Sequence, residues 1–201
     1  MNKKNILIWL IFGLVMLVSF RVSQARSLSM HFVDEEDHMA GAELMKRGYK
    51  LHEQIQGNHQ PLVYLASSSI QRLTVPNNIF MLIRRHRQAM FIYGFIWSAI
   101  ILWRFKTIGL IFVVFFEFLK YGLFGNLLLM ESLAVYPAVY LFFVFLEEKS
   151  PRRPELIWLG LSTFVIVFSL VPLYPWLILV WLGLLVKLKQ KIIWPLLTFS
   201  L

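Results

Sequence analysis

The segment FVDEEDH, residues 32–38, follows the first long apolar run of the chain, residues 5–20. It places four acids and a histidine in a chain whose other long segments are almost all apolar. Because burying an unpaired carboxylate in hydrocarbon is costly, these acids must lie in water or in a polar cavity. They form either a candidate functional site or the solvated start of a helix, where the macrodipole favours Asp and Glu.

The composition is that of a membrane protein. Of the 201 residues, 58% are hydrophobic, whereas soluble domains average about 45–50% apolar residues. We therefore expect an all-α fold, a polytopic membrane helix bundle of about six to seven spans that forms one domain over residues 1–201. There is no cysteine, which excludes disulfides, thiolate metal sites and a cysteine nucleophile.

The net charge of +9 comes from basic residues that stand between apolar runs. This arrangement favours anionic lipid, and not nucleic acid, as the partner of the positive charge. With Lys3 and Lys4 in the cytoplasm, the basic segments 104–106, 149–153 and 187–191 all fall on the cytoplasmic side as well. We therefore expect a multi-pass protein of the cell membrane with a cytoplasmic N-terminus. A cleaved signal peptide ending near residue 25 is the alternative for the first run.

The connection over residues 23–87 is then external and too long to be a passive turn. It is expected to hold one helix over residues 34–47, with Gly48 as its C-cap, and a second from residue 61 to about residue 73. Met39, Ala42 and Met45 recur at helical spacing in the first helix, and this spacing predicts one apolar face.

The apolar positions of the second helix are Leu62, Leu65, Ile70 and Leu73. Farther on, Glu117 and Lys120 lie on one helical face, which predicts a mutually neutralising pair near the membrane boundary. The arginines of residues 84–87 fall on the external side, although basic residues of membrane proteins gather on the cytoplasmic side. Either a long translocated loop does not follow this rule, or these arginines bind an anionic group such as a lipid phosphate.

The last apolar run, residues 192–201, is too short to cross a bilayer core as a helix. It is either re-entrant or the start of a further span, and we expect the chain to be the N-terminal portion of a longer protein.

The order of these motifs resembles a known family. Asp34-Glu35 lies just past a short N-terminal helix, His59-Gln60-Pro61-Leu62 ends the external loop, an Arg-led membrane helix follows, and Glu131 stands at the start of a later one. This is similar to the N-terminal part of the C-type membrane glycosyltransferases, closest to the dolichyl-phosphate-mannose protein mannosyltransferase and aminoarabinose transferase group. The family has two prolines where this chain has Gln60-Pro61.

The resemblance implies a role for each matching residue. Asp34 falls at the position of the family's catalytic acid, with Glu35 supporting it, and His59 would line the same cavity. Arg84 or Arg87 would hold the phosphate of a polyprenyl-phosphate sugar donor. Glu131 matches an acid on the external side. The acceptor would be a protein or a glycolipid, and a divalent metal near Asp34 is compatible with the family.

Two other functions stay open. A small multi-span transporter needs polar groups among its membrane helices, for which Glu117, Lys120 and Glu131 are the candidates. A non-catalytic membrane scaffold, or a truncated transferase without activity, is the other. His38 lies four residues after Asp34 on one helical face; such a pair fits a metal site, although a plain hydrogen bond is the commoner outcome.

Overall fold

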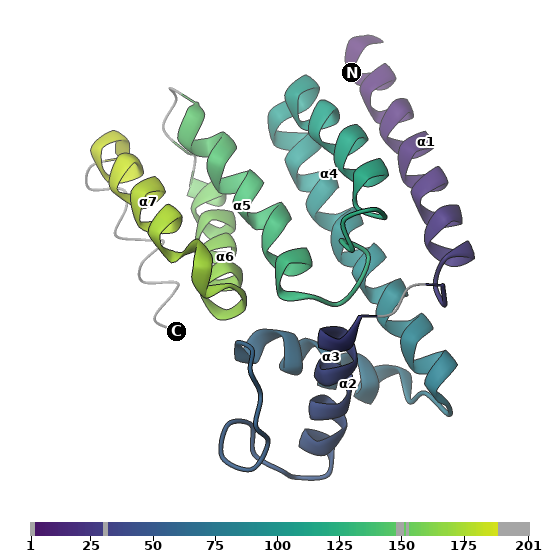
Figure 1. Cartoon of the computed structure of the whole chain (residues 1–201). Coiled ribbons are helices and arrows are strands. Elements are labelled where there is room, and N and C mark those ends of the chain that lie inside the picture. The colour runs from purple at the N-terminus through teal and green to yellow at the C-terminus, as the bar shows by residue number, and fades with distance from the viewer. Residues whose placement is uncertain (1–2, 30–31, 148–150, 152, 189–201) are drawn as a thin grey trace.

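The computed structural model describes residues 3–188 except 30–31, 148–150 and 152. The described residues fold into helices without a β-sheet, as the composition predicted (Figure 1). The helices, in chain order, are α1 (Lys3–Ala25), α2 (Val33–Lys46), α3 (Pro61–Thr74), α4 (Ile79–Leu119), α5 (Met130–Leu146), α6 (Arg153–Ser169), a short 3-10 turn η1 (Val171–Leu173) and α7 (Tyr174–Leu188).

The described residues form three apolar cores. One lies between α1 and α4, where Phe12 and Met16 pack with Leu102 and Val113. The second joins α4 to the three C-terminal helices around Trp97 and its neighbours. The third joins α3 to α4, α5 and α6.

α5 carries a proline inside the helix. Pro137 cannot donate to the carbonyl of Leu133, one turn earlier. The hydroxyl of Tyr93 on α4 donates to that carbonyl instead, at 2.5 Å, so an apolar helix keeps its backbone satisfied.

α4 consists of two helical segments that meet at Lys106, whose backbone has φ 51° and ψ −116°. The segments contain two apolar stretches of the sequence, residues 89–103 and 107–119, with the basic residues Arg104 and Lys106 between them. The two segments fold back on one another. Gly109 in the second segment lies so close to the first that an added Cβ would stand 2.7 Å from the Ile101 carbonyl oxygen. The short basic stretch at residues 104–106 thus forms the turn of a helical hairpin.

α1 and α4 are each long and apolar enough to cross a membrane, and α5, α6 and α7 are shorter apolar helices. Large apolar side chains face outward along these helices: Leu10 is 66% exposed and Phe115 is 65% exposed. Exposed apolar side chains on long apolar helices are typical of a protein that associates with a membrane.

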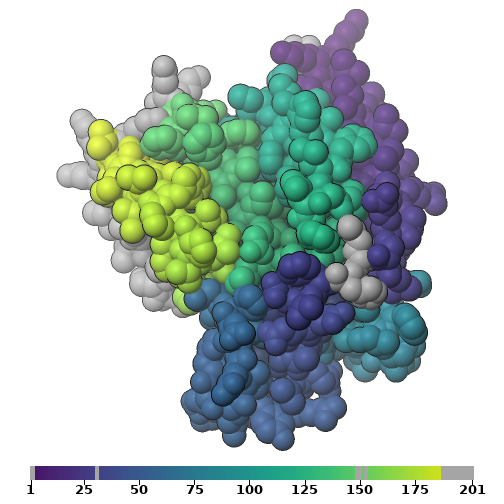
Figure 2. Space-filling view, viewed as in Figure 1, coloured from purple at the N-terminus to yellow at the C-terminus, as the bar shows by residue number. Residues whose placement is uncertain are grey.

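α2 and α3 form a separate layer across one end of the bundle (Figures 1 and 2). Their bounds agree with the expected helices to within one residue, and Gly48 has a φ of +95°, the left-handed conformation expected of a C-cap glycine. Met39 and Ala42 of α2 are buried, as their spacing predicted.

None of the four apolar positions named for the second helix is fully buried in α3. Leu65 is 49% and Leu73 is 85% exposed, while Ser67 and Gln71 are buried. The polar face is buried because its side chains hydrogen-bond to α2 and α4, which spacing along one helix cannot reveal.

The opposite end of the bundle carries the basic turn of α4. Arg104 forms ion pairs with Glu147, at the end of α5, and with Glu155, in the first turn of α6. The turn of α4, the end of α5 and the start of α6 thus lie together, away from α2 and α3 (Figure 1). The last apolar run, residues 192–201, lies outside the described residues.

Candidate functional site at the α2–α3 end of the bundle

α2 is fixed to the bundle by a buried ion pair. The carboxylate of Glu35 meets the guanidinium of Arg87 on α4, and the two side chains are only 3% and 1% exposed. The same Glu35 oxygen accepts a hydrogen bond of 2.7 Å from the backbone N–H of Leu128. A buried carboxylate needs such partners to offset its lost hydration. The first turn of α2 is therefore held against α4 and the segment before α5.

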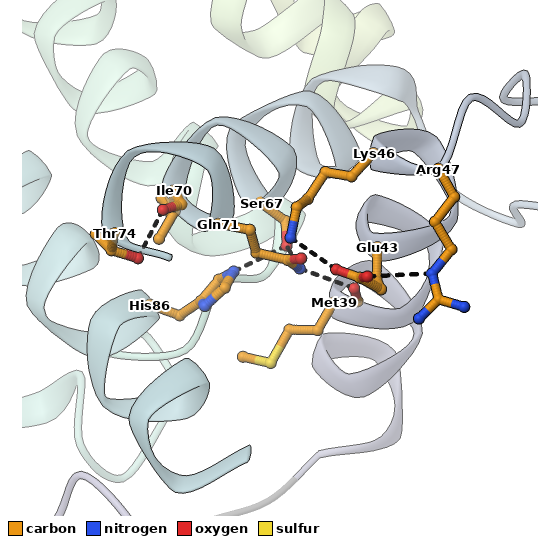
Figure 3. A network of polar contacts seen from close by, with 9 residues as sticks. All are labelled: Met39, Glu43, Lys46, Arg47, Ser67, Ile70, Gln71, Thr74 and His86. Carbon is orange, nitrogen blue, oxygen red and sulfur yellow. Dashed lines mark hydrogen bonds and ion pairs between the residues drawn. The ribbon is translucent and has the colours of Figure 1, made fainter. Parts of the chain in front are cut away.

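A second set of polar contacts joins α2, α3 and α4 (Figure 3). The Gln71 side-chain amide donates to the Met39 carbonyl at 2.9 Å, and the Ser67 hydroxyl lies 2.8 Å from Nε2 of His86. His86 Nδ1 lies 2.8 Å from the Leu82 carbonyl, which can only accept, so Nδ1 carries the proton and Nε2 accepts from Ser67. These contacts explain why α3 buries its polar face.

The C-terminal turn of α2 has its own surface contacts. Glu43 pairs with Lys46 at 2.8 Å and with Arg47 at 3.2 Å (Figure 3). The hydrogen bond from Lys46, and then that from Arg47, lowers the pKa of the Glu43 carboxyl. Exposed pairs of this kind add little stability, so the position of α2 depends on its buried contacts.

The N-terminal half of α2 gathers two acids and a histidine beside the loop before α3. Asp34 Oδ1 lies 3.9 Å from His59 Nε2, and the Asp34 side chain is 47% exposed. Asp37 Oδ2 accepts a hydrogen bond of 2.6 Å from the hydroxyl of Tyr64 on α3. The rings of His38 and His59 lie edge to face, with centroids 4.8 Å apart. Two of the predicted site residues, Asp34 and His59, are thus neighbours.

Burial determines the ionisation of this group. It lowers the pKa of the His38 imidazole, against a smaller opposite effect of the hydrogen bond to Leu128. It also raises the pKa of Tyr64, and the bond to Asp37 raises it further. His38 is therefore neutral near pH 7, and Tyr64 is a hydrogen-bond donor.

The remaining predicted residues lie in different surroundings. Arg84 is exposed near the start of α4, and Glu131 is exposed in the first turn of α5. Arg87 is buried, and its guanidinium faces Glu35 and not an open site. The carboxylate that meets a guanidinium is thus Glu35, whereas Asp34 stays accessible. The roles of these residues toward a substrate stay predictions.

A second polar cluster lies between α1 and the end of α4. Lys120 Nζ pairs with Glu117 at 2.6 Å, which confirms the expected neutralising pair. The Ser19 hydroxyl and, at 2.9 Å, the Tyr136 hydroxyl also donate to Glu117. Beside it is a cavity of about 180 Å³, and its lining includes Val15, Val18, Ser19, Arg26, Glu117 and Tyr121.

Sequence reasoning missed Asp37, Tyr64 and the backbone of Leu128. Asp37 stood in the acidic cluster but had no distinguishing spacing, and Tyr64 follows the quoted loop motif by only two residues. The proximity of His38 to His59 depends on how the loop returns to α2, for which the sequence carries no signal.

Comparison of the chain with protein-family models, with curated proteins and with solved structures finds no match in any of the three. The glycosyltransferase resemblance therefore depends on the residues quoted for it.

Proposed function

We propose that the chain belongs to a membrane glycosyltransferase that moves a sugar from a polyprenyl-phosphate donor to an acceptor hydroxyl. The observation that carries the proposal is the state of Asp34. Its carboxylate is accessible at the first turn of a helix that Glu35 holds in place, and its neighbour is His59. A general base must be both reachable by substrate and held in position.

The reaction needs few groups. The acceptor hydroxyl oxygen attacks the anomeric carbon while Asp34 takes the hydroxyl proton. The bond from that carbon to the phosphate oxygen breaks, and polyprenyl phosphate leaves. Attack opposite the leaving group inverts the anomeric carbon. Arg84, exposed near the start of α4, supplies positive charge for the phosphate. A planar guanidinium can donate two parallel hydrogen bonds to two phosphate oxygens.

The proposed location follows from the apolar surface. The helices of the bundle lie in the cell membrane as several spans, with the N-terminus in the cytoplasm and the α2–α3 layer on the external face. Lys3 and Lys4 at the start of α1 and the basic turn at residues 104–106 support this orientation. A lipid-linked donor then reaches Asp34 from the outer leaflet.

The test is sugar transfer by membranes that contain the full-length protein, measured as release of polyprenyl phosphate from a panel of polyprenyl-phosphate sugars. Asp34→Asn keeps the shape of the side chain but removes the base, so the rate is expected to fall about 10²- to 10⁴-fold. Glu36→Gln changes an exposed acid two residues away and is expected to leave the rate unchanged. Equal rates for Asp34→Asn and the unmodified protein would show that Asp34 is not the base.

A second candidate is a small transporter, and the observation that favours it is the Glu117 cavity. A buried acid that lines a cavity between membrane helices is a typical proton-coupling group. Dissipation of a pH gradient across proteoliposomes discriminates the two functions. Loss of this activity in Glu117→Gln, but not in Asp34→Asn, would favour the transporter.

A further inference from the structure

His38 has one nitrogen with a partner and one without. Its side chain is fully buried, and Nδ1 lies 3.0 Å from the Leu128 carbonyl oxygen. A carbonyl only accepts, so Nδ1 carries the proton and Nε2 presents a lone pair. Nε2 has no hydrogen-bond partner among the described residues. His86 has the same kind of carbonyl bond, but its Nε2 accepts from Ser67.

Two further side chains that can bind a metal lie beside His38. One carboxylate oxygen of Asp37 and one nitrogen of each of His38 and His59 all lie within 4.8 Å of one another. In a tetrahedral zinc site with bonds of about 2.0–2.2 Å, neighbouring ligand atoms are about 3.3–3.5 Å apart. His59 stands in the loop before α3, outside any helix, so a rotation of its side chain can supply the difference.

The surroundings of the ligands are those of a metal centre. Histidine ligands usually donate their other ring N–H to a carbonyl or a carboxylate, and ligating carboxylates are themselves hydrogen-bonded. His38 meets the first condition through Leu128, and Asp37 meets the second through the Tyr64 hydroxyl. Asp34, next to His59, adds a second negative charge that favours a dication.

We infer that Asp37, His38 and His59 bind a divalent transition metal, with Zn²⁺ as the best fit. Two imidazoles and one carboxylate leave the fourth position of a tetrahedral Zn²⁺ open. The metal site shares His59 and its neighbour Asp34 with the proposed transferase site but does not depend on the transfer reaction. A failed transfer assay leaves it intact, and a failed binding assay leaves the proposed role of Asp34 intact.

The binding experiment uses the full chain in detergent, purified through a tag without histidine and stripped with a chelator. Titration with Zn²⁺ against a chromophoric chelator is expected to give one site per chain. Loss of a residue that hydrogen-bonds to a metal ligand typically weakens metal binding 10–100-fold. Loss of a ligand itself costs more, so His59→Ala and Asp37→Asn are each expected to weaken Zn²⁺ binding at least about 100-fold. His52→Ala, which removes an exposed histidine of the same loop, is the matched control and is expected to bind normally.

A spectroscopic variant keeps the test valid even where a ligand deletion harms folding. The chain has no cysteine, so His59→Cys introduces its only thiol. With Co²⁺ in place of Zn²⁺, a thiolate-to-cobalt charge-transfer band is expected in His59→Cys and not in His52→Cys. Absence of that band, absence of a stoichiometric site, or equal affinity in His59→Ala and His52→Ala would overturn the inference.

Discussion

The Glu35–Arg87 pair is the contact that joins α2 to α4. The two side chains are 52 residues apart in the chain, and the pair is closed to solvent. Buried ion pairs of this kind are costly to break from one side, because the remaining charge loses its partner but stays buried. The sequence presented Glu35 as a supporting acid and Arg87 as a phosphate ligand. Only the fold brings them together, since nothing in either segment encodes a partner at that separation.

We expect Arg87→Met to lower the free energy of unfolding by about 3–5 kcal/mol, because it leaves Glu35 buried without its guanidinium. The double variant with Glu35→Leu removes both charges and is expected to be more stable than Arg87→Met alone. Thermal unfolding in detergent measures both. If the double variant lost as much free energy of unfolding as the two single variants together, the two side chains would not interact.

The protonation of His38 predicts a pH dependence in metal-free protein. Burial lowers the His38 pKa below its ordinary value of 6.5, so the folded state binds fewer protons than the unfolded state between the two pKa values. The contribution of His38 to the free energy of unfolding is therefore fully present above pH 6.5 and is lost as the pH falls below that value. The midpoint of thermal unfolding in the presence of chelator is expected to drop over this range, and less steeply in His38→Gln. A parallel slope in His38→Gln would assign the effect to other groups.

At the scale of the elements, local signals predicted the helix bounds and the buried face of α2, but not the buried face of α3. Capping acids, Pro61 and Gly48 predicted α2 and α3 to within one residue because these signals act inside each segment. The apolar positions of α3 did not indicate its buried face, since Ser67 and Gln71 are held inward by His86 and Met39 of other helices. The two apolar stretches of residues 89–103 and 107–119 indicated the two segments of α4. They did not indicate along which side of the first segment the second one packs.

The close approach inside α4 gives a prediction for this element. An added Cβ at Gly109 would stand 2.7 Å from the Ile101 carbonyl oxygen, which is backbone and cannot move aside cheaply. We expect Gly109→Ala to lower the unfolding temperature. The matched control is Gly13→Ala in α1, where an added Cβ meets nothing within 4 Å and better helix propensity makes the change neutral or stabilising. Equal unfolding temperatures for the two variants would contradict the hairpin packing.

At the scale of the whole molecule, the polar groups separate toward the two ends of an apolar bundle. α2 and α3 cover one end of the bundle, and the turn of α4 and the end of α5 lie at the other (Figure 1). The first end carries Asp34, Asp37, His38 and His59, and the second carries the pair of Arg104 with Glu147. Hydropathy predicted the apolar helices, and the positions of the basic residues predicted which connections share an end. Neither could place His59 beside Asp34, because that contact depends on the path of the loop.

This separation predicts which residues are reached from outside the cell. A membrane-impermeant maleimide is expected to label Glu53→Cys, in the exposed loop before α3, in intact cells. Lys3→Cys, at the start of α1, is expected to react only after permeabilisation. The native chain has no cysteine to react in the background. The reverse labelling pattern would place α2 and α3 in the cytoplasm.

In the proposed reaction, a lipid-linked sugar meets Asp34 at the end of the bundle covered by α2 and α3. The most direct test is photo-crosslinking of the full-length protein, in membranes, to a polyprenyl-phosphate sugar that carries a photoreactive group beside its phosphate. Mass spectrometry is expected to find the cross-links in residues 32–38 and 79–88, and an excess of unlabelled donor is expected to suppress them. Cross-links concentrated instead at residues 104–106, Glu147 and Glu155, at the opposite end of the bundle, would contradict this placement of the donor.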